Sequence, residues 1–407
     1  MSRIDDLIAE LAPDGVQFRA VGEVTARSSS IKWINAGDDQ FQYIDLSSVD
    51  RVTRKIGKTL TITAENAPSR AQQIVHAGDV IFATTRPAQM RWAVIPAEYD
   101  GQIASTGYCV LRPDTSAVLT NYLAHLLGAD PFHQYIEANQ VAGNYPSIAD
   151  NRVRAYRIPV PPLEVQHEIV RVLDQFTQLE AELEAELEAR TRQYDYYREL
   201  ILTEVAVDAE RVALGDLGRI VTGRTPKSSD NSAWGLEVDF VTPSDIKNGM
   251  KSVSGTTRQL SMAGAAAMVK MRIPAGSLLV TCIGADMGKT VINGRDCVTN
   301  QQINAIIPEA ELHVGYVFHV LTAMRQQLRV QGEQGGGTLP LINKTAFSKI
   351  EIPLPTLARQ EAVAGLLDEF DVLVNDLSVG LPAELRARRK QYEYYRDKLL
   401  TFEELPA

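Results

Sequence analysis

Apolar residues recur every three to four positions along two long segments of the chain. The stripe of the first segment comprises Val165, Ile169, Val172, Phe176, Leu179, Leu183, Leu187, Tyr194, Tyr197 and Ile201. The stripe of the second comprises Val363, Leu366, Phe370, Leu373, Leu377, Leu381, Leu385, Tyr392, Tyr395 and Leu399. This spacing is typical of helices that pack along one another as a coiled coil. Roughly 40 helical residues span about 60 Å, so both segments are predicted to be spacers. The second helix is predicted to break near Gly380. Glycine commonly ends a helix, and Pro382 is expected to lie at an early position of the next one.

Residues 15–157 and 208–351 show a different pattern, in which short β-type runs alternate with turns. Each stretch has a strand led by glycine, from Gly78 to Phe82 and from Gly276 to Val280, and a polar loop follows it. Apart from such landmarks the two stretches share little sequence. We therefore predict two domains of the α/β (α+β) class that have the same arrangement of strands but different surfaces.

The chain is a tandem duplication. IPVPPLEVQHEIVRVLDQF at 158–176 is answered by IPLPTLARQEAVAGLLDEF 194 positions later, and RQYDYYRELILT at 192–203 by KQYEYYRDKLLT 198 positions later. The second copy has therefore gained four residues, about one helical turn. The predicted parts are a short N-terminal helix (1–14), domain 1 (15–157), a central spacer helix (158–207), domain 2 (208–351) and C-terminal spacer helices (352–407). In the resulting approximate two-fold arrangement, Ile4 to Leu11 is expected to play the part before domain 1 that Leu200 to Val207 plays before domain 2.

The composition fits a globular protein of more than one domain, with 407 residues of which 45% are hydrophobic. No apolar run reaches the roughly 18 residues that would span a bilayer, and the polar start MSRIDDLIAE lacks the apolar core of a signal peptide. We expect a cytoplasmic protein with no membrane partner. The three cysteines show no CxxC spacing and the six histidines no HExxH pattern, so we expect neither a disulfide nor a metal site.

A formal net charge of −10 argues against nucleic-acid binding until its distribution is considered. The balance of Lys and Arg against Asp and Glu is −2 for residues 1–162 (15 against 17) and −7 for residues 163–206 (4 against 11). It is +2 for residues 207–356 (15 against 13) and −3 for residues 357–407 (7 against 10). The acidity is concentrated in the helical segments, so the domains are close to neutral and can carry local basic faces.

The chain resembles the specificity (S) subunits of type I restriction-modification systems. The resemblance is carried by the two Ile-Pro-x-Pro-x-Leu helix starts with Gln166 and Gln360, by the ending LPAELRARRKQYEYYRDKLLTF and by the tandem plan, and it covers essentially the whole chain. It implies two target-recognition domains, each of which reads one half of a split, asymmetric site in double-stranded DNA. It also implies that an antiparallel pair of long helices holds the domains apart and sets the gap between the half-sites. The helices would dock two methyltransferase (M) subunits, and restriction (R) subunits would join that core.

By the same resemblance this chain is not an enzyme and binds no cofactor itself. S-adenosylmethionine would belong to the methyltransferase, and ATP and Mg²⁺ to the restriction subunit. In agreement, the sequence has neither GxGxxG nor an Asn-Pro-Pro-aromatic tetrapeptide. The helix residues expected to contact partner subunits are Gln166, Phe176, Tyr197, Gln360, Phe370 and Tyr395. For the tyrosine clusters at 194–197 and 392–395, packing within the helix pair remains the alternative.

Candidate DNA contacts lie in the polar loops of the two domains. Arg suits guanine and Asn or Gln suits adenine at the base edges, whereas Lys, Ser, Thr and backbone groups hold phosphates. The candidates in domain 1 are Arg51, Arg54, Lys55, Lys58, Arg86, Gln89, Arg91, Asn144 and Tyr145. Those in domain 2 are Arg224, Thr225, Lys227, Thr242, Ser244, Lys247, Asn300, Gln302, Gly336 and Lys344. The alternative is ordinary exposed polar residues, or, for Asn300 and Gln302, hydrogen bonding inside the fold.

Two motifs point to other chemistry and fail on inspection. Gly284 to Thr290 is one residue short of GxxxxGK[ST] and continues into a strand-like run, whereas a phosphate-binding loop continues into a helix. Ser244 to Lys247 matches SxxK, but no SDN or KTG partner follows. Two alternatives to an S subunit remain open, namely the recognition subunit of a type IIB-like system and a coiled-coil structural scaffold.

Overall fold

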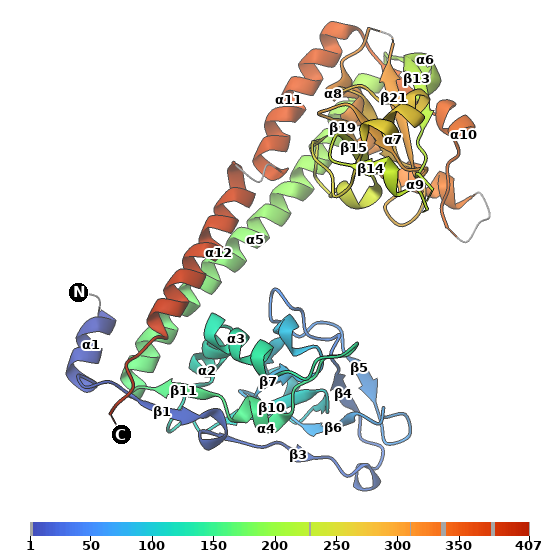
Figure 1. Ribbon diagram of the computed structural model, residues 1–407. Coiled ribbons are helices and arrows are strands. Elements are labelled where there is room, and N and C mark those ends of the chain that lie inside the picture. Colours follow the sequence, from blue (N-terminus) through green and yellow to red (C-terminus); the bar gives the residue numbers. More distant parts are fainter. Residues whose placement is uncertain (1–2, 228, 310, 335–338, 376–378, 407) are drawn as a thin grey trace. The chain divides into compact units, whose positions relative to one another are not determined.

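The computed structural model describes residues 3–227, 229–309, 311–334, 339–375 and 379–406 (Figure 1). The chain forms two compact units, of which unit 1 comprises residues 1–181 and 387–407 and unit 2 comprises residues 182–386. Each unit contains one β-rich domain and the helix segments on which that domain packs. The boundaries between the units fall inside the long helices α5 and α12, so each of these helices contributes to both units.

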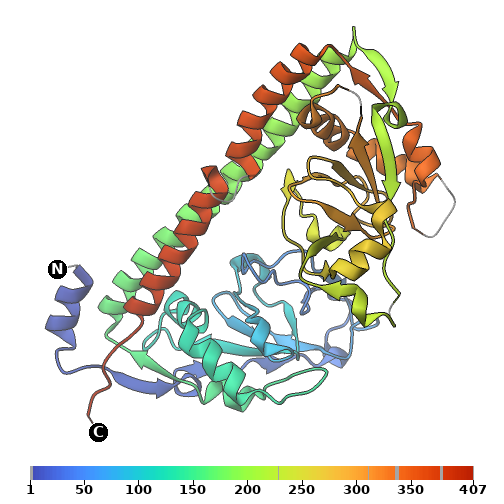
Figure 2. The same cartoon turned by 45° about the horizontal axis from the view of Figure 1, so that its top comes forward.

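The long helices follow the two apolar stripes. Helix α5 (Leu163–Ala206) is continuous over 44 residues, and the second stripe forms α11 (Leu357–Asn375) and α12 (Gly380–Leu399). The break lies where the sequence predicts it, but Gly380, with φ +74°, begins α12 and does not end α11. Leu377 lies outside the described residues. In unit 1, α12 runs beside the first half of α5 in both views (Figures 1 and 2). No helix among the described residues is both long enough and apolar enough to cross a membrane.

Both spacers begin directly after a strand that contains the Ile-Pro-x-Pro motif. In unit 1, β11 (Arg157–Val160) pairs antiparallel with β1 (Gln17–Ala20), and in unit 2, β22 (Glu351–Leu354) pairs antiparallel with β12 (Glu210–Ala213). Pro161 and Pro355, which follow these strands, cannot donate a hydrogen bond to a strand ladder. Each spacer helix begins two residues later, at Leu163 and at Leu357.

Domain 1 has two sheets besides the β1–β11 pair, with strand orders β2-β10-β7-β8 and β3-β6-β9-β4-β5. Successive side chains of strand β7 point to opposite faces of its sheet and enter two different hydrophobic cores. Val80 and Phe82 belong to the core shared with the helices, whereas Ile81 and Ala83 belong to the core under the second sheet. The helices of unit 1 that precede α5 are α1 (Arg3–Leu11), α2 (Thr120–Leu127), α3 (Asp130–Asn139) and α4 (Asp150–Arg154). The remaining strands are β2 (Thr25–Ala26), β3 (Ser29–Ser30), β4 (Phe41–Ile44), β5 (Leu60–Ile62), β6 (Ala71–Ile74), β7 (Val80–Ala83), β8 (Trp92–Val94), β9 (Ile103–Ser105) and β10 (Tyr108–Pro113).

Domain 2 has sheets of order β13-β21-β18-β19-β16 and β14-β17-β15-β20. Its helices are α6 (Leu214–Leu217), α7 (Met262–Ala267), α8 (Val314–Ala323), α9 (Arg325–Glu333) and α10 (Lys344–Ser348). Its other strands are β13 (Gly218–Thr222), β14 (Trp234–Gly235), β15 (Val238–Val241), β16 (Ser252–Val253), β17 (Gln259–Leu260), β18 (Leu278–Thr281), β19 (Thr290–Asn293), β20 (Cys297–Thr299) and β21 (Ile303–Pro308). The short 3₁₀ turns of the chain are η1 (Val21–Glu23), η2 (Trp33–Asn35), η3 (Pro87–Gln89), η4 (Ala97–Tyr99), η5 (Asn231–Ala233), η6 (Pro243–Asp245) and η7 (Val269–Met271).

The two domains share one strand frame. The order β2-β10-β7-β8 corresponds to β13-β21-β18-β19 in domain 2, where β16 is added at the edge. The registers agree as well, because Val80 lies opposite Leu111 in domain 1 and Leu278 lies opposite Ile306 in domain 2. Val80 and Leu278 are 198 positions apart, which is one of the two offsets of the sequence repeat. The frame is therefore duplicated even where the sequences have diverged.

The C-terminal tail plays in unit 1 the part that Leu200 to Val207 plays in unit 2. Leu400 and Leu202 are 198 positions apart, and each is buried in the main core of its unit. Beyond Leu400, the backbone N–H of Val16 donates to the carbonyl of Glu403 (2.9 Å), and the carbonyl of Val16 accepts from Leu405 N (3.0 Å). Ile4 to Leu11, to which the sequence assigned this part alone, lies in helix α1 before β1 and packs its buried Ile4 on the same core, so both segments contribute to it.

Candidate nucleic-acid interface

Two polar loops of domain 1 meet as a pair. The loop between β7 and β8 bears Arg86 and Gln89, and residues 141–147 bear Asn144 and Tyr145. Thr85 bridges Ser147, the N–H of Arg86 donates to the carbonyl of Pro146 (2.7 Å), and the Arg86 guanidinium carbon lies 5.2 Å from the centre of the Tyr145 ring. A guanidinium over an aromatic face is an attractive cation–π contact. Gln89, Asn144 and Tyr145 are exposed around it, so the structure brings together four of the predicted residues.

The backbone of the β7–β8 loop is held in a left-handed conformation at two positions, Arg86 and Met90. Arg54 (φ +59°), Arg86 (φ +50°) and Met90 (φ +49°) are the three non-glycine residues with positive φ in the described part of the chain. A non-glycine residue in this region costs about 1–2 kcal/mol, and such residues cluster at functional sites. Arg86 and Met90 flank the 3₁₀ turn η3, so the turn presents its side chains from a bent and strained corner.

The equivalent loop of domain 2 has the same bend made by glycine. Gly284 (φ +87°) and Gly288 (φ +80°) lie 198 positions after Arg86 and Met90. Ile283 bridges Leu341 as Thr85 bridges Ser147, and the N–H of Gly284 donates to Pro340 as that of Arg86 does to Pro146. The apparent phosphate loop is thus a turn between β18 and β19, as the following strand predicted. Its Lys289 is held by Asp286 (2.7 Å) and by the carbonyl of Ile246 (3.1 Å).

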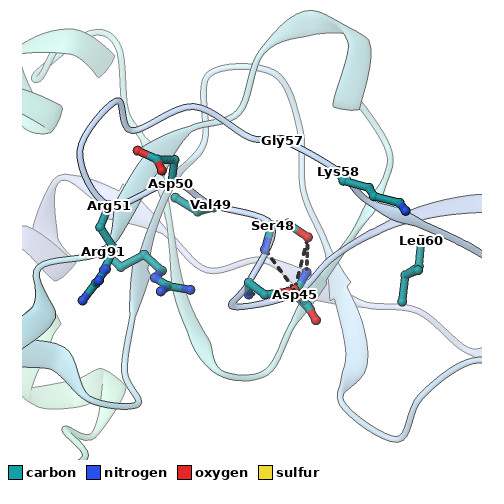
Figure 3. A pocket seen from close by; sticks show the side chains of 10 residues that line it. Asp45, Ser48, Val49, Asp50, Arg51, Gly57, Lys58, Leu60 and Arg91 are labelled. Carbon is teal, nitrogen blue, oxygen red and sulfur yellow. Dashed lines mark hydrogen bonds between the residues drawn. The ribbon is translucent and has the colours of Figure 1, made fainter. Parts of the chain in front are cut away.

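A cavity of about 620 Å³ beside these loops collects basic side chains (Figure 3). Its lining includes Arg51, Lys58 and Arg91, and none of these forms an ion pair in the described part of the chain. In the view of Figure 3, Arg51 and Arg91 lie on one side of the cavity and Lys58 on the other. Asp45, Ser47, Ser48, Val49, Asp50, Gly57 and Leu60 complete the lining.

The two carboxylates of the cavity are turned into their own loop. Burial tends to raise the pKa of Asp45, but hydrogen bonds from Ser47 and Ser48 outweigh it and hold that pKa below its usual value. Backbone N–H groups of Thr53 and Val52 lower the pKa of Asp50 in the same way. Both carboxylates are therefore charged at neutral pH and already bound by donors, which leaves the three cations of the cavity available to an anion.

Arg54 and Lys55, the other two members of the predicted basic cluster, differ from each other. The Arg54 guanidinium donates to the carbonyl of Met90 and lies 5.2 Å from the centre of the Trp92 ring. Burial lowers the pKa of Arg54. Its side chain joins residues 51–58, which bear the basic cluster, to the β7–β8 loop, so we do not retain it as a phosphate contact. Lys55 is exposed.

The candidates of domain 2 are more scattered. Arg224, Thr225 and Lys227 are exposed on the segment after β13, where the hydroxyl of Thr225 donates to Gln301 (2.9 Å). Ser244, Lys247 and Lys344 are exposed as well. Thr242 caps the turn η6, because its hydroxyl and its N–H both donate to Asp245. Asn300 is buried and bonded to Gln302 (2.9 Å), so that pair shapes the turn before β21, which is the alternative considered from the sequence. Gly336 lies outside the described residues.

The expected partner-binding residues fall into two kinds. The side chains of Gln166 and Gln360 are buried, and each makes hydrogen bonds inside its own unit, so we do not retain them as docking residues. Phe176 stacks on Tyr395 with ring centres 5.6 Å apart, and Tyr395 is partly exposed. Phe370 and Tyr197 are each more than 40% exposed on α11 and α5. Phe176 and Tyr395 belong to unit 1, and Phe370 and Tyr197 belong to unit 2.

The three cysteines of the chain are buried. Burial raises the pKa of Cys109, Cys282 and Cys297 to about 12 each, so these thiols are not nucleophiles at neutral pH. Within the described ranges, no cluster of three or more His, Cys, Asp or Glu side chains is arranged to hold a metal ion.

Sequence reasoning overlooked Met90 and Trp92, which hold Arg54, and the equivalence of the two β-hairpin loops. The offset of 198 that aligns the tyrosine motifs also aligns Arg86 with Gly284 and Met90 with Gly288, so this equivalence was available from the sequence. Together these features define a class of protein. Its members have two domains with the same strand order but different polar loops, and each domain packs on long helices.

Comparison with known proteins names the family. A family model described as type I restriction modification DNA specificity domain matches the chain twice, over residues 13–189 and 206–387. The chain belongs to this family, whose members are the specificity subunits of type I restriction-modification systems.

Its relatives agree along the whole chain. The chain is 28% identical over 401 residues to the EcoR124I/EcoR124II specificity subunit of Escherichia coli, with 95% of this chain and 94% of the relative covered. It is 26% identical to the HindI specificity subunit of Haemophilus influenzae, with 80% and 85% covered. Among solved structures, a chain from a study of complex assembly and conformational transition of the type I R-M system is 25% identical, with a TM-score of 0.63 and 96% and 98% covered. The fold of the S subunit from M. genitalium is also similar, at 11% identity, a TM-score of 0.51 and 95% and 96% covered.

Proposed function

We propose that each domain reads one half of a bipartite, asymmetric DNA site, and that the loop pair of domain 1 supplies the base contacts on its side. The observation that carries this proposal is the convergence of Arg86 and Tyr145 from two loops on a strained backbone. An arginine held at a rigid corner is suited to the O6 and N7 acceptors of guanine in the major groove. Gln89 and Asn144 beside it supply amides, which suit adenine.

The basic cavity is the phosphate contact of the same half-site. Arg51, Lys58 and Arg91 surround one hollow next to the loop that reads the bases, and none of them is paired with a carboxylate among the described residues. Phosphate contacts fix the register of a protein on the duplex and provide most of the salt-dependent affinity. In domain 2 the exposed Arg224, Thr225, Lys227, Ser244, Lys247 and Lys344 are the corresponding candidates.

The helices carry the proposed partner surface. Exposed aromatic side chains on otherwise polar helices are typical of protein interfaces. Phe176 with Tyr395, and Phe370 with Tyr197, lie at related positions of the repeat. We infer that each pair docks one methyltransferase subunit, with restriction subunits joining that core. S-adenosylmethionine would then be held by the methyltransferase, and ATP and Mg²⁺ by the restriction subunit, and this chain would catalyse no step.

Methylation profiling of the co-expressed complex tests the proposal. A random DNA library exposed to this chain with its methyltransferase should show one asymmetric motif of two half-sites at a fixed gap. Arg86→Ala should alter one half of the motif, and Arg224→Ala should alter the other half. Methylation without sequence preference, or both halves changing with either variant, would contradict the assignment.

A further inference from the structure

A buried histidine of each domain contacts two long helices. His125 lies on α2 of domain 1 and His319 on α8 of domain 2, 194 positions later. Their side chains are 7% and 0% exposed. A buried imidazole is costly unless its ring nitrogens have partners, and in each unit an aspartate and a tyrosine hydroxyl lie within 3.4 Å of them.

In unit 1 the two partners of His125 come from different repeats. Nε2 of His125 lies 2.9 Å from Oδ1 of Asp174 on α5, and Nδ1 lies 3.0 Å from the hydroxyl of Tyr392 on α12. A carboxylate only accepts hydrogen bonds, so Nε2–H donates to Asp174, and in the neutral imidazole Nδ1 is then the acceptor for the tyrosine hydroxyl. Asp174 belongs to the helix that follows domain 1 directly, whereas Tyr392 is 267 positions away in the sequence.

Unit 2 repeats this arrangement with the helices exchanged. Nε2 of His319 lies 2.7 Å from Oδ1 of Asp368 on α11, and Nδ1 lies 3.4 Å from the hydroxyl of Tyr194 on α5. Unlike the hydroxyl of Tyr392, that of Tyr194 also lies 3.3 Å from Oδ1 of Asp371 on α11, to which it donates. The offsets to unit 1 are 194 for the histidines and aspartates and 198 for the tyrosines. Lys251 of domain 2 also pairs with Asp368. We call each His, Asp and Tyr set a triad.

The triads supply what apolar packing against the helices does not. Burial of Leu173 or Leu202 favours contact between domain and helix but is not directional, so it allows small rotations. Hydrogen bonds weaken steeply when their angles change. Gln166 and Gln360 fix each domain only at the start of its own spacer helix, through backbone groups near Leu119 and His313. The tyrosine of each triad adds a directional contact to the helix contributed by the other repeat.

We propose that the two triads are positioning residues for bipartite recognition, which fix each domain on its helices and thereby restrict the gap accepted between the half-sites. This inference rests on the proposed function. One base pair advances the duplex by about 3.4 Å and turns it by a tenth of a helical turn. A domain that shifts by this amount on its helices reads a half-site at a neighbouring gap.

The test uses the complex with its methyltransferase and DNA that carries both wild-type half-sites at the wild-type gap and at gaps up to two base pairs shorter or longer. Tyr392→Phe removes only the triad hydroxyl of unit 1, and Tyr194→Phe removes that of unit 2 together with its hydrogen bond to Asp371. The matched controls are Tyr122→Phe and Tyr316→Phe. Tyr122 lies on α2 with His125, and Tyr316 lies on α8 with His319. Their buried hydroxyls donate to the carbonyls of Pro159 (3.3 Å) and Pro353 (2.9 Å), and no hydrogen bond joins them to the described parts of the long helices. Thermal unfolding of all four variants is measured beside methylation.

The triad variants are expected to raise methylation at neighbouring gaps, relative to the wild-type gap, by about fivefold, which is the ratio that one typical hydrogen bond is worth. The half-site sequences should not change, and the controls should lower stability without broadening the gap. Triad variants that lose stability like the controls but keep the wild-type gap profile would overturn the inference and leave the proposed function standing. A wild-type complex that ignores the gap would instead overturn the proposed function, and the inference with it.

Discussion

Arg86 and Gly284 occupy the same corner of equivalent loops in the two domains, and both have a left-handed backbone, with φ of +50° and +87°. Glycine adopts this conformation without strain, whereas arginine does not. Domain 1 therefore places a long cation where the frame favours glycine, and the proposed recognition role gives a reason for the strain.

Replacement of Arg86 separates stability from recognition. Arg86→Gly should be about 1 kcal/mol more stable than Arg86→Ala, because only glycine relieves the left-handed backbone. Both variants should reduce methylation at sites with the wild-type half-site of domain 1 by about tenfold or more, as expected when a bidentate base contact is lost. Denaturant unfolding and methylation profiling measure the two effects. Retention of the half-site by Arg86→Gly would show that the side chain does not read DNA.

The reciprocal change in domain 2 checks the conformational argument. A Cβ at Gly284 meets no atom within 4 Å, so any cost of Gly284→Ala is conformational. We expect a loss of about 1 kcal/mol in the free energy of unfolding. A variant of wild-type stability would mean that the corner relaxes without cost.

The basic cavity predicts a change in salt dependence. Arg51→Gln, Lys58→Gln and Arg91→Gln should each lower the slope of log binding constant against log salt by about 1 in the methyltransferase complex. Affinity should fall on all DNA sequences alike, because phosphates carry no sequence information. Lys32→Gln, an exposed cation of domain 1 outside the cavity lining, is the control. An unchanged slope in all three variants would refute phosphate binding there.

Gln166 should act on folding and not on partner docking. Its amide accepts from Leu119 N (2.9 Å) and donates to the carbonyls of Ala117 (2.9 Å) and Pro161 (2.8 Å) in the interior. Gln166→Ala leaves these backbone groups without a partner, at a cost of about 3 kcal/mol. Thermal unfolding should show the loss, while protein that remains folded should still copurify with the methyltransferase. A variant of normal stability that fails to copurify would restore Gln166 to the docking surface.

Acid should weaken unit 2 through His319. Burial, the largest effect, lowers the pKa of His319 to about 4 against the opposing influence of Asp368. The unfolded chain binds a proton near pH 6.5 that the folded unit does not accept until about pH 4, so this contribution is complete above pH 6.5 and is lost as the pH falls. Between pH 7.5 and pH 5 the loss should be roughly 2 kcal/mol. Urea midpoints of the wild type and of His319→Gln should diverge in this window, and parallel curves would contradict the prediction.

The sequence by itself determined the duplication, the long helices and the two-domain plan. These features depend on periodicity and spacing, and the apolar stripe of α5 or the Ile-Pro-x-Pro start is readable from neighbouring residues. The resemblance of the helix starts to specificity subunits gave the family for the same reason.

Only the tertiary structure decided which polar side chains face outward together. Arg51 and Arg54 are three positions apart, yet one lines the cavity and the other turns inward to Met90 and Trp92. Gln166 and Gln360 repeat as a surface motif would, but each is buried to satisfy backbone groups of its own unit. His125 and Tyr392 are 267 positions apart. Such contacts depend on which chain segments the apolar cores bring together, and no local pattern in the sequence records that.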